Sequence, residues 1–170
     1  KIGKDALENG IVKAGDTFED VAQKSEALRQ ETGKKIGEIY SKAKDALSNQ
    51  KFLDSLSPAQ RTEIIESSFN PARDVDKLKK LVYDKFKGTP GGEAIISRVN
   101  GDLDAMAERY GNTIDLTDAL KIKHDWDNEI NFAKRFVEMP KYQDAALMIR
   151  NFIRDKMNSN VDAIGKVLEK

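Results

Sequence analysis

Apolar side chains recur every three or four residues along most of this 170-residue chain, and this helical period limits the possible folds more than any other feature. The clearest run predicts one helix from Asp16 or Thr17 to Asn49, about 50 Å long at 1.5 Å per residue. No segment alternates polar and apolar residues for more than a few positions, as a strand would. We therefore expect an all-α fold. The face of this first helix consists of Phe18, Val21, Ser25, Leu28, Thr32, Ile36, Ile39, Ala43 and Leu47.

The middle of the chain is predicted to form shorter helices, because capping signals recur there. Ser57-Pro58 followed by Gln60 is a capping-box pattern, and Asn70-Pro71 repeats the cap-then-proline signal. Gly88 and Gly111 are expected to end the second and third of these helices. The three apolar stripes are Ile64, Ile65 and Phe69; then Val75, Leu78, Val82 and Phe86; then Ile96, Val99, Leu103, Met106 and Tyr110.

The last third is predicted to be an antiparallel helical hairpin, because Met139-Pro140 interrupts two stripes that each keep their phase. Trp126 belongs to the first stripe and is expected in the seam against the final helix. His124, two residues earlier, is expected on the solvent side. The stripes are Leu116, Leu120, Trp126, Ile130, Ala133 and Val137, and Tyr142, Ala146, Ile149, Ile153, Met157, Val161, Ile164 and Leu168.

These elements predict a single helical domain over residues 1–170, with the shape of an elongated helical bundle. Its expected parts are a long N-terminal helix over 1–50, short helices over 51–111 and the hairpin over 112–170. The chain begins at Lys1 and not at Met, its start lacks the apolar run that a signal peptide needs, and it ends inside an apolar repeat. We interpret it as a fragment cut from a larger protein or as a processed product.

Charge and composition argue against several classes of partner. Lys+Arg and Asp+Glu both number 29, so no general attraction to nucleic acid is expected. No window is apolar enough for a membrane span. The absence of cysteine excludes disulfides, thiolate metal sites and cysteine nucleophiles. Locally, residues 71–88 are net basic and 89–120 net acidic, which predicts mutual attraction of the two adjacent helices.

No catalytic, cofactor-binding or metal-binding residue is predicted. His124 is the only histidine, and a solvated surface side chain is a better interpretation of it than a metal ligand beside Asp127. The loop Gly88-Thr89-Pro90-Gly91-Gly92 precedes a helix, as phosphate-binding loops do, but lacks the Walker pattern, so a helix-connecting turn is favoured.

Acidic side chains also give no specific site. Asn100, Asp102 and Asp104 imitate the start of a calcium loop but lack its glycine and its final glutamate. Pairs such as Glu63/Glu66 and Asp125/Asp127 are expected by chance among 29 carboxylates. Two glycines four apart, Gly33 and Gly37, mark either a close helix crossing or a weak point of the first helix.

A family resemblance covers about a third of the chain. Leu116-Thr117-Asp118-Ala119-Leu120, Trp126-Asp127-Asn128-Glu129-Ile130-Asn131 and residues 145–156 resemble helical hairpins in virion proteins of tailed phages and prophages. The resemblance implies a structural or assembly role within a large parent protein. It implies no functional residue, because such segments carry no catalytic motif.

We therefore expect a non-catalytic helical module that acts by assembly or protein interaction, with a protein partner or a second copy as its ligand. No cofactor, nucleic acid or small-molecule substrate is expected, and localisation stays open. The first alternative is a helical adaptor or regulatory domain of a cellular protein that binds a partner helix. An enzyme fragment or hydrolase using carboxylates is the second alternative, and a cleft holding two or more carboxylates with raised pKa values would favour it.

Overall fold

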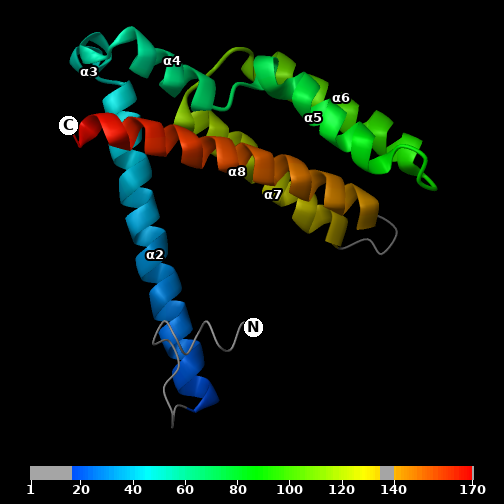
Figure 1. Ribbon diagram of the computed structural model, residues 1–170. Coiled ribbons are helices and arrows are strands. Elements are labelled where there is room, and N and C mark those ends of the chain that lie inside the picture. The colour runs from blue at the N-terminus through cyan, green and yellow to red at the C-terminus, as the bar shows by residue number, and fades with distance from the viewer. Residues whose placement is uncertain (1–16, 135–139, 170) are drawn as a thin grey trace. The chain divides into compact units, whose positions relative to one another are not determined.

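The computed structural model describes residues 17–134 and 140–169, and these residues form helices without any strand (Figure 1). The all-α prediction is therefore confirmed. The chain divides into two compact units, residues 1–42 and residues 43–170. The described helices are α2 (Phe18–Leu47), α3 (Gln50–Ser55), α4 (Pro58–Ser67), α5 (Pro71–Phe86), α6 (Gly92–Tyr110), α7 (Leu116–Lys134) and α8 (Pro140–Leu168).

The long first helix begins as its sequence predicts. Thr17 caps α2, since its hydroxyl accepts from the backbone N–H of Asp20 at 3.2 Å and the Asp20 carboxylate accepts from the backbone N–H of Thr17 at 2.9 Å. The helix continues through Gly33 and Gly37 to Leu47 without a break. No described atom lies within 4 Å of a Cβ built at either glycine, so neither marks a close crossing within the chain.

The predicted caps of the middle helices are also present. Ser57 and Gln60 form the reciprocal capping box of α4, and the Asn70 side chain caps α5 by accepting from Arg73 N at 2.9 Å. The helix α6 passes through Asn100-Gly101, as its period predicts, but begins at Gly92 rather than at Thr89-Pro90. A short helix missing from the prediction is α3, capped by Asn49. Six residues hold too few apolar positions to show a period.

The core lies within residues 43–170, where α7 packs along α8, α5 along α6, and α4 and α6 against α8. In Figure 1, α7 and α8 lie side by side and run in opposite directions. The turn of the predicted hairpin, 135–139, and Val137 lie outside the described residues. The side chains that α8 buries are Tyr142, Ala145, Ala146, Ile149, Ile153, Met157, Asn160, Val161, Ala163 and Ile164.

Some predicted core positions are wrong. Leu120 of α7 is 42% exposed, and Ala119 and Ile122 are buried in its place. At 100° per residue Leu120 lies about 120° around the helix from Trp126, whereas Ala119 and Ile122 lie within about 40° of it. Trp126 itself is buried, as predicted, and His124 is exposed.

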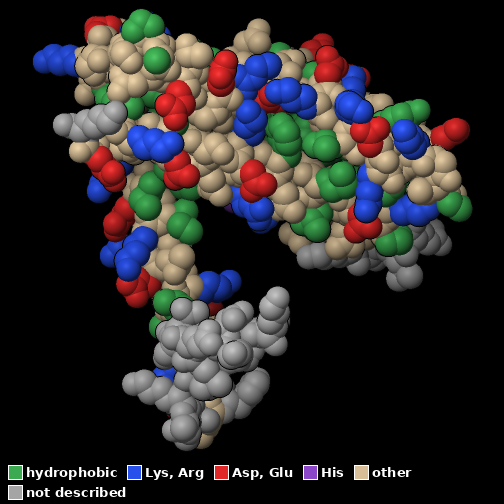
Figure 2. Space-filling view, viewed as in Figure 1, with side chains coloured by type: hydrophobic (Ala, Val, Ile, Leu, Met, Phe, Trp, Pro, Cys, Tyr) green, Lys and Arg blue, Asp and Glu red, His purple; other side chains and the backbone are tan. Residues whose placement is uncertain are grey.

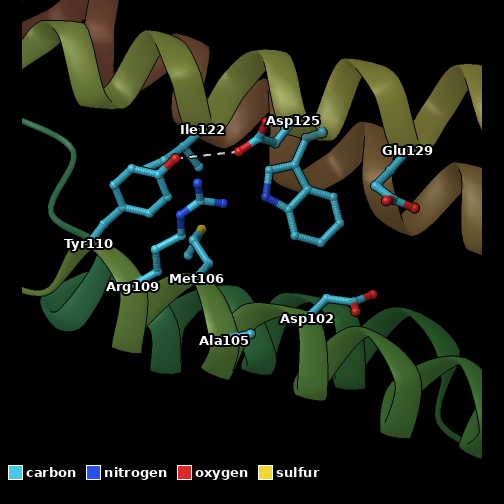
Figure 3. Close-up of a pocket in the computed structure, with 9 residues that line it drawn as sticks. Asp102, Ala105, Met106, Arg109, Tyr110, Ile122, Asp125 and Glu129 are labelled. Atoms are coloured by element: carbon cyan, nitrogen blue, oxygen red, sulfur yellow. Dashed lines mark hydrogen bonds between the residues drawn. The ribbon is translucent and has the colours of Figure 1, made fainter.

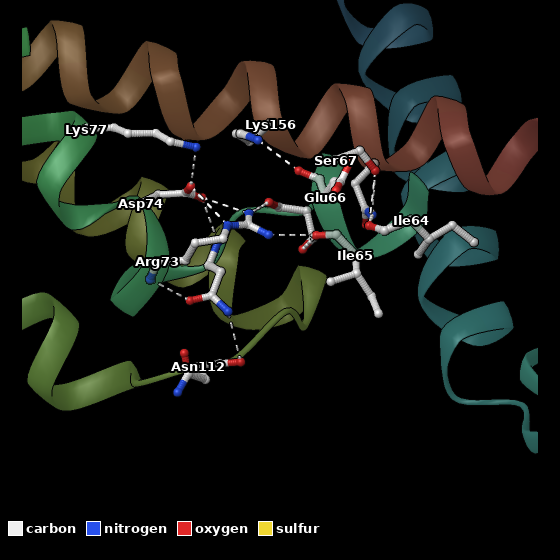
Figure 4. Close-up of polar contacts among 12 residues, drawn as sticks. Ile64, Ile65, Glu66, Ser67, Arg73, Asp74, Lys77, Asn112 and Lys156 are labelled. Atoms are coloured by element: carbon white, nitrogen blue, oxygen red, sulfur yellow. Dashed lines mark hydrogen bonds and ion pairs between the residues drawn. The ribbon is translucent and has the colours of Figure 1, made fainter. Parts of the chain in front are cut away.

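A buried polar junction joins α4, α5 and α8 (Figure 4). Asp74 is completely buried and accepts hydrogen bonds from the Asn70 backbone N–H at 3.0 Å and from Arg73 Nε at 3.1 Å. Arg73 also donates to the Ile65 carbonyl at 2.9 Å, at the end of α4. From α8, the buried Asn160 amide donates to the Ile64 carbonyl at 2.7 Å. The junction therefore satisfies the last carbonyls of α4 with side chains of its neighbours.

Candidate functional site

A cleft of about 220 Å³ lies between α6 and α7. Its lining combines apolar side chains with an excess of acidic ones, and Figure 3 shows the labelled residues of the two helices facing one another across it. Residues lining the cleft are Asp102, Ala105, Met106, Arg109, Tyr110, Ile122, Asp125, Trp126 and Glu129. Three carboxylates against one guanidinium give the cleft a negative potential that would favour a cationic group.

Two of these carboxylates are tied to α8 by one phenol. The hydroxyl of the buried Tyr142 lies 3.0 Å from Asp102 Oδ2 and 2.9 Å from Glu129 Oε2. Burial raises the pKa of Tyr142 well above its usual value, and the neighbouring Glu129 and Asp102 raise it further. The phenol therefore stays neutral and donates its single hydrogen to one carboxylate at a time. These contacts link α6, α7 and α8.

The guanidinium group of Arg98 lies beside the same cluster. The guanidinium carbon of Arg98 lies 4.1 Å from the centre of the Tyr142 ring, within the range of a cation–π contact. On the other side of the cleft, the Tyr110 hydroxyl lies 3.4 Å from Asp125 Oδ2. The carboxylates of the cleft are thus engaged with aromatic side chains of neighbouring helices. Such contacts hold neighbouring helices together.

The two carboxylates of the acidic pair Asp125/Asp127 contact different helices. Asp127 accepts from Lys123 Nζ at 2.7 Å and from Arg150 Nε at 2.8 Å, joining α7 to α8. Burial raises the pKa of Asp127, but these two cations outweigh it and hold that pKa below its usual value. His124 Nδ1 is 3.8 Å from the same carboxylate, and its side chain is 63% exposed.

The remaining acidic residues and the glycine-rich segment take part in contacts and turns between helices. Within the described residues no group of three His, Asp or Glu side chains converges as a metal site would require. Asp104 pairs with Lys79 across α5 and α6, which provides one contact of the predicted attraction between these helices. Glu63 lies 3.5 Å from Lys166 of α8. The glycine-rich segment forms the turn between α5 and α6, with positive φ at Gly88 and Gly91.

An exposed apolar face runs along α2 within the first unit. Leu28, Ile36 and Ile39 are 45%, 48% and 52% exposed. They lie within about 80° of one another around the helix, on the predicted stripe. In Figure 2, hydrophobic side chains are visible on this helix among charged ones. The stripe becomes buried only at Ala43, where the second unit begins.

Four charged side chains of α2 form ion pairs within the helix. Glu26 pairs with Arg29 at 3.0 Å and Glu31 with Lys35 at 2.7 Å, three and four residues apart. The apolar face is therefore bordered by charged side chains. The face and the α6–α7 cleft are the two candidate sites of the described residues.

Sequence reasoning did not predict the polar centres of the second unit. Asp74 and Asn160 are fully buried, and Tyr142 is tied to two acids. Asn160 lies on the apolar stripe of α8, three residues after Met157 and four before Ile164, and the Asp74 carboxylate follows the Asn70-Pro71 cap by one turn. Both signals are present in the sequence. The sequence does not identify the Ile64 carbonyl that Asn160 binds, because that partner comes from another helix, whereas Asp74 binds Asn70 and Arg73 within four residues of it.

No known protein family matches this chain, and no curated protein or solved structure is significantly similar to it. Among the described residues no helix is both long and apolar enough to cross a membrane.

Proposed function

We propose that this chain is a non-catalytic assembly module that binds another helix along the apolar face of α2. The observation that carries the proposal is the exposure of Leu28, Ile36 and Ile39 on one stripe. A stripe of the same kind on α8 is buried from Tyr142 to Ile164. In α2, helical spacing has produced an apolar face that the described residues of the first unit leave uncovered.

The energetics favour a helix as the ligand of this face. Full burial of an aliphatic side chain contributes about 1.5–3 kcal/mol to binding. Leu28, Ile36 and Ile39 are each about half exposed, so covering them contributes about 1 kcal/mol per side chain. A partner that contacts all of them must follow the helix for three turns from residue 28 to residue 39. An amphipathic helix with the same three-and-four spacing meets this requirement.

The non-catalytic part of the proposal is supported by the α6–α7 cleft. Its carboxylates Asp102 and Glu129 share the hydroxyl of Tyr142, so both take part in holding three helices together. The resemblance of residues 116–120, 126–131 and 145–156 to phage virion segments fits the same assembly role. We extend the proposal to a component of a virion on that ground.

The test compares two lysine substitutions on opposite faces of α2. Leu28→Lys introduces a charge into the apolar face, and Ala27→Lys introduces the same charge one residue away, on the exposed opposite side. Leucine and lysine have similar helix propensities, so both variants keep the helix. The probe is a labelled synthetic peptide with leucine at every a and d position and Lys/Glu elsewhere, followed by fluorescence anisotropy.

We expect the peptide to bind the wild-type chain and Ala27→Lys equally, and Leu28→Lys at least tenfold more weakly. Circular dichroism of both variants checks that the helix content is unchanged. Equal binding to Leu28→Lys, or no binding to any of the three proteins, would contradict the proposal.

A further inference from the structure

The apolar face of α2 has a spacing that is the same in both chain directions. Its positions Ser25, Leu28, Thr32, Ile36 and Ile39 follow one another by three, four, four and three residues. Thr32 is the centre of this symmetry. Two copies of α2 that run in opposite directions therefore meet layer by layer, with Thr32 opposite Thr32, Leu28 opposite Ile36 and Ser25 opposite Ile39.

The sizes of the side chains suit this direction better than the other. In the antiparallel pair each outer layer combines a small Ser25 with a large Ile39, so the separation of the helices is even along the seam. A parallel pair would place Ser25 opposite Ser25 at one end and Ile39 opposite Ile39 at the other.

Charge is also distributed asymmetrically about Thr32. Residues 22–31 carry two acidic and two basic side chains, and the mirror segment 33–42 carries one acidic and three basic ones. An antiparallel pair brings the basic half of each copy against the neutral half of the other. A parallel pair would place the two basic halves side by side. The charged residues are Lys24, Glu26, Arg29 and Glu31 before Thr32, and Lys34, Lys35, Glu38 and Lys42 after it.

We infer that the partner of α2 is the α2 of a second copy of this chain, paired antiparallel about Thr32. The inference rests on the proposed function, since it names the helix that the exposed face binds. The paired segment lies before Ala43, which is already buried in the second unit. Within it, Leu28, Ile36 and Ile39 of each copy become covered.

The first experiment measures mass by sedimentation equilibrium over a range of protein concentrations. The average mass is expected to rise from 19.1 kDa toward twice that value for the wild-type chain and for Ala27→Lys. Leu28→Lys is expected to raise the dissociation constant at least tenfold. A wild-type chain that stays at 19.1 kDa at every concentration overturns the inference, and so does a dimer that Leu28→Lys leaves unchanged.

The second experiment determines the direction of the helices by disulfide trapping, which the absence of native cysteine makes unambiguous. A disulfide requires Cα atoms about 4.4–6.8 Å apart. In the antiparallel pair the two Ser25 positions are about 21 Å apart along the helix axis, whereas Ser25 faces Ile39 of the second copy. An equimolar mixture of Ser25→Cys and Ile39→Cys is therefore expected to form the mixed disulfide faster than either variant forms its own.

Thr32→Cys is the positive control, because residue 32 of one copy faces residue 32 of the other in both the antiparallel and the parallel pair. Ser41→Cys is the negative control, about 160° around the helix from Ser25. Faster trapping of Ser25→Cys with itself than with Ile39→Cys shows a parallel pair and overturns the inference. If the chain stays monomeric while the leucine peptide still binds α2, the proposed function stands and self-pairing fails. If both assays are negative, both proposals fail.

Discussion

Asp74 is a buried carboxylate that keeps its charge because its neighbours are arranged around it. Burial raises the pKa of Asp74, but hydrogen bonds from Arg73 and the Asn70 backbone, together with the charges of Arg73 and Lys156, lower it below the ordinary 3.8. The carboxylate connects the first turn of α5 with the end of α4 through Arg73, which also binds the Ile65 and Ser68 carbonyls. Its charge is therefore part of the packing of the second unit.

Asp74→Asn is expected to lower the free energy of unfolding by about 1.5–3 kcal/mol, because charge-assisted hydrogen bonds are replaced by weaker or mismatched ones. Urea titration measures this loss, with Asp76→Asn as the control, since Asp76 is exposed on the same helix. A change no larger than that of the control would show that the junction contributes little.

The lowered pKa of Asp74 also predicts how stability depends on pH. A carboxyl group whose folded pKa is below its unfolded one stabilises the fold above the unfolded value, and this contribution disappears as pH falls through the folded value. We expect the stability difference between wild type and Asp74→Asn to be full at pH 6. It should shrink as the pH is lowered below about 4. A difference that is the same at pH 3 and pH 6 would contradict this assignment.

Trp126 gives a second prediction at the scale of one residue. It is 4% exposed, whereas the His124 side chain two residues earlier is 63% exposed. Trp126→Ala should lower stability by about 3–5 kcal/mol, and His124→Ala by no more than about 0.5 kcal/mol. Because Trp126 is the only tryptophan, its emission should be blue-shifted in the native protein and shift red on unfolding. Emission typical of exposed indole in the native state would contradict its burial.

Within the second unit, the sequence predicts the burial of single residues where a helix has one clear apolar stripe, and the prediction fails where neighbouring apolar positions compete. Trp126 and His124 were assigned to the correct sides because they are separated by about 200° around the helix. Leu120 joins the predicted stripe because it follows Leu116 by four residues, although Ala119 has the better phase relative to Trp126 and is the buried one. The Tyr142 cluster could not be predicted, since its acids come from two other helices.

At the scale of the element, α6 contains two glycines with opposite roles. A Cβ built at Gly92 would lie 2.0 Å from the Phe86 carbonyl oxygen, so the first residue of this helix must lack a side chain. Gly101, in the middle of the helix, has nothing within 4 Å of its built Cβ. The turn before α6 therefore requires its glycine, and the interior of α6 does not.

The same substitution should consequently change stability in opposite directions at these two positions. Gly92→Ala is expected to lower the thermal midpoint, because the α5–α6 turn has to open to relieve the clash. Gly101→Ala should raise stability by up to about 1 kcal/mol, the difference in helix propensity between the two residues. Differential scanning calorimetry of the two variants measures both effects. Equal destabilisation by both would mean that α6 tolerates no side chain at either place.

The elements themselves were largely predictable, because their signals are local. Ser57, Asn70 and Thr17 cap helices where the sequence places a capping residue before an apolar period. The prediction places the start of α6 at Thr89-Pro90 instead of Gly92, since Thr89-Pro90 imitates the cap-then-proline signal. In the structure Thr89 instead closes the preceding turn by donating to the Phe86 carbonyl at 2.8 Å. The exposed side of α2 could not be predicted, because periodicity marks an apolar face whether or not the chain covers it.

At the scale of the whole molecule, burial is concentrated in one unit. Every buried hydrophobic side chain of the described residues lies at Ala43 or beyond it. Residues 18–42 form a helix with a largely exposed surface. An exposed helix of this kind is only marginally stable by itself, since most helical stability in proteins comes from packing. The two units should therefore contribute unequally to the cooperative unfolding of the chain.

This inequality can be measured by shortening the chain. A protein consisting of residues 43–170 keeps all of the described core, so its thermal midpoint at low protein concentration should stay within about 2 °C of the full chain, less than the roughly 2–4 °C that a loss of 1 kcal/mol would cause. Trp126 fluorescence reports this transition in both proteins, because Trp126 belongs to the retained unit. At the same low concentration, backbone amides of residues 20–40 should exchange with solvent much faster than those of α8. At high concentration, pairing of α2 should slow the exchange of residues 20–40 and leave α8 unaffected. A large drop of the midpoint on truncation would instead mean that residues before Ala43 stabilise the core directly, and that the apolar face of α2 is part of the fold of one chain.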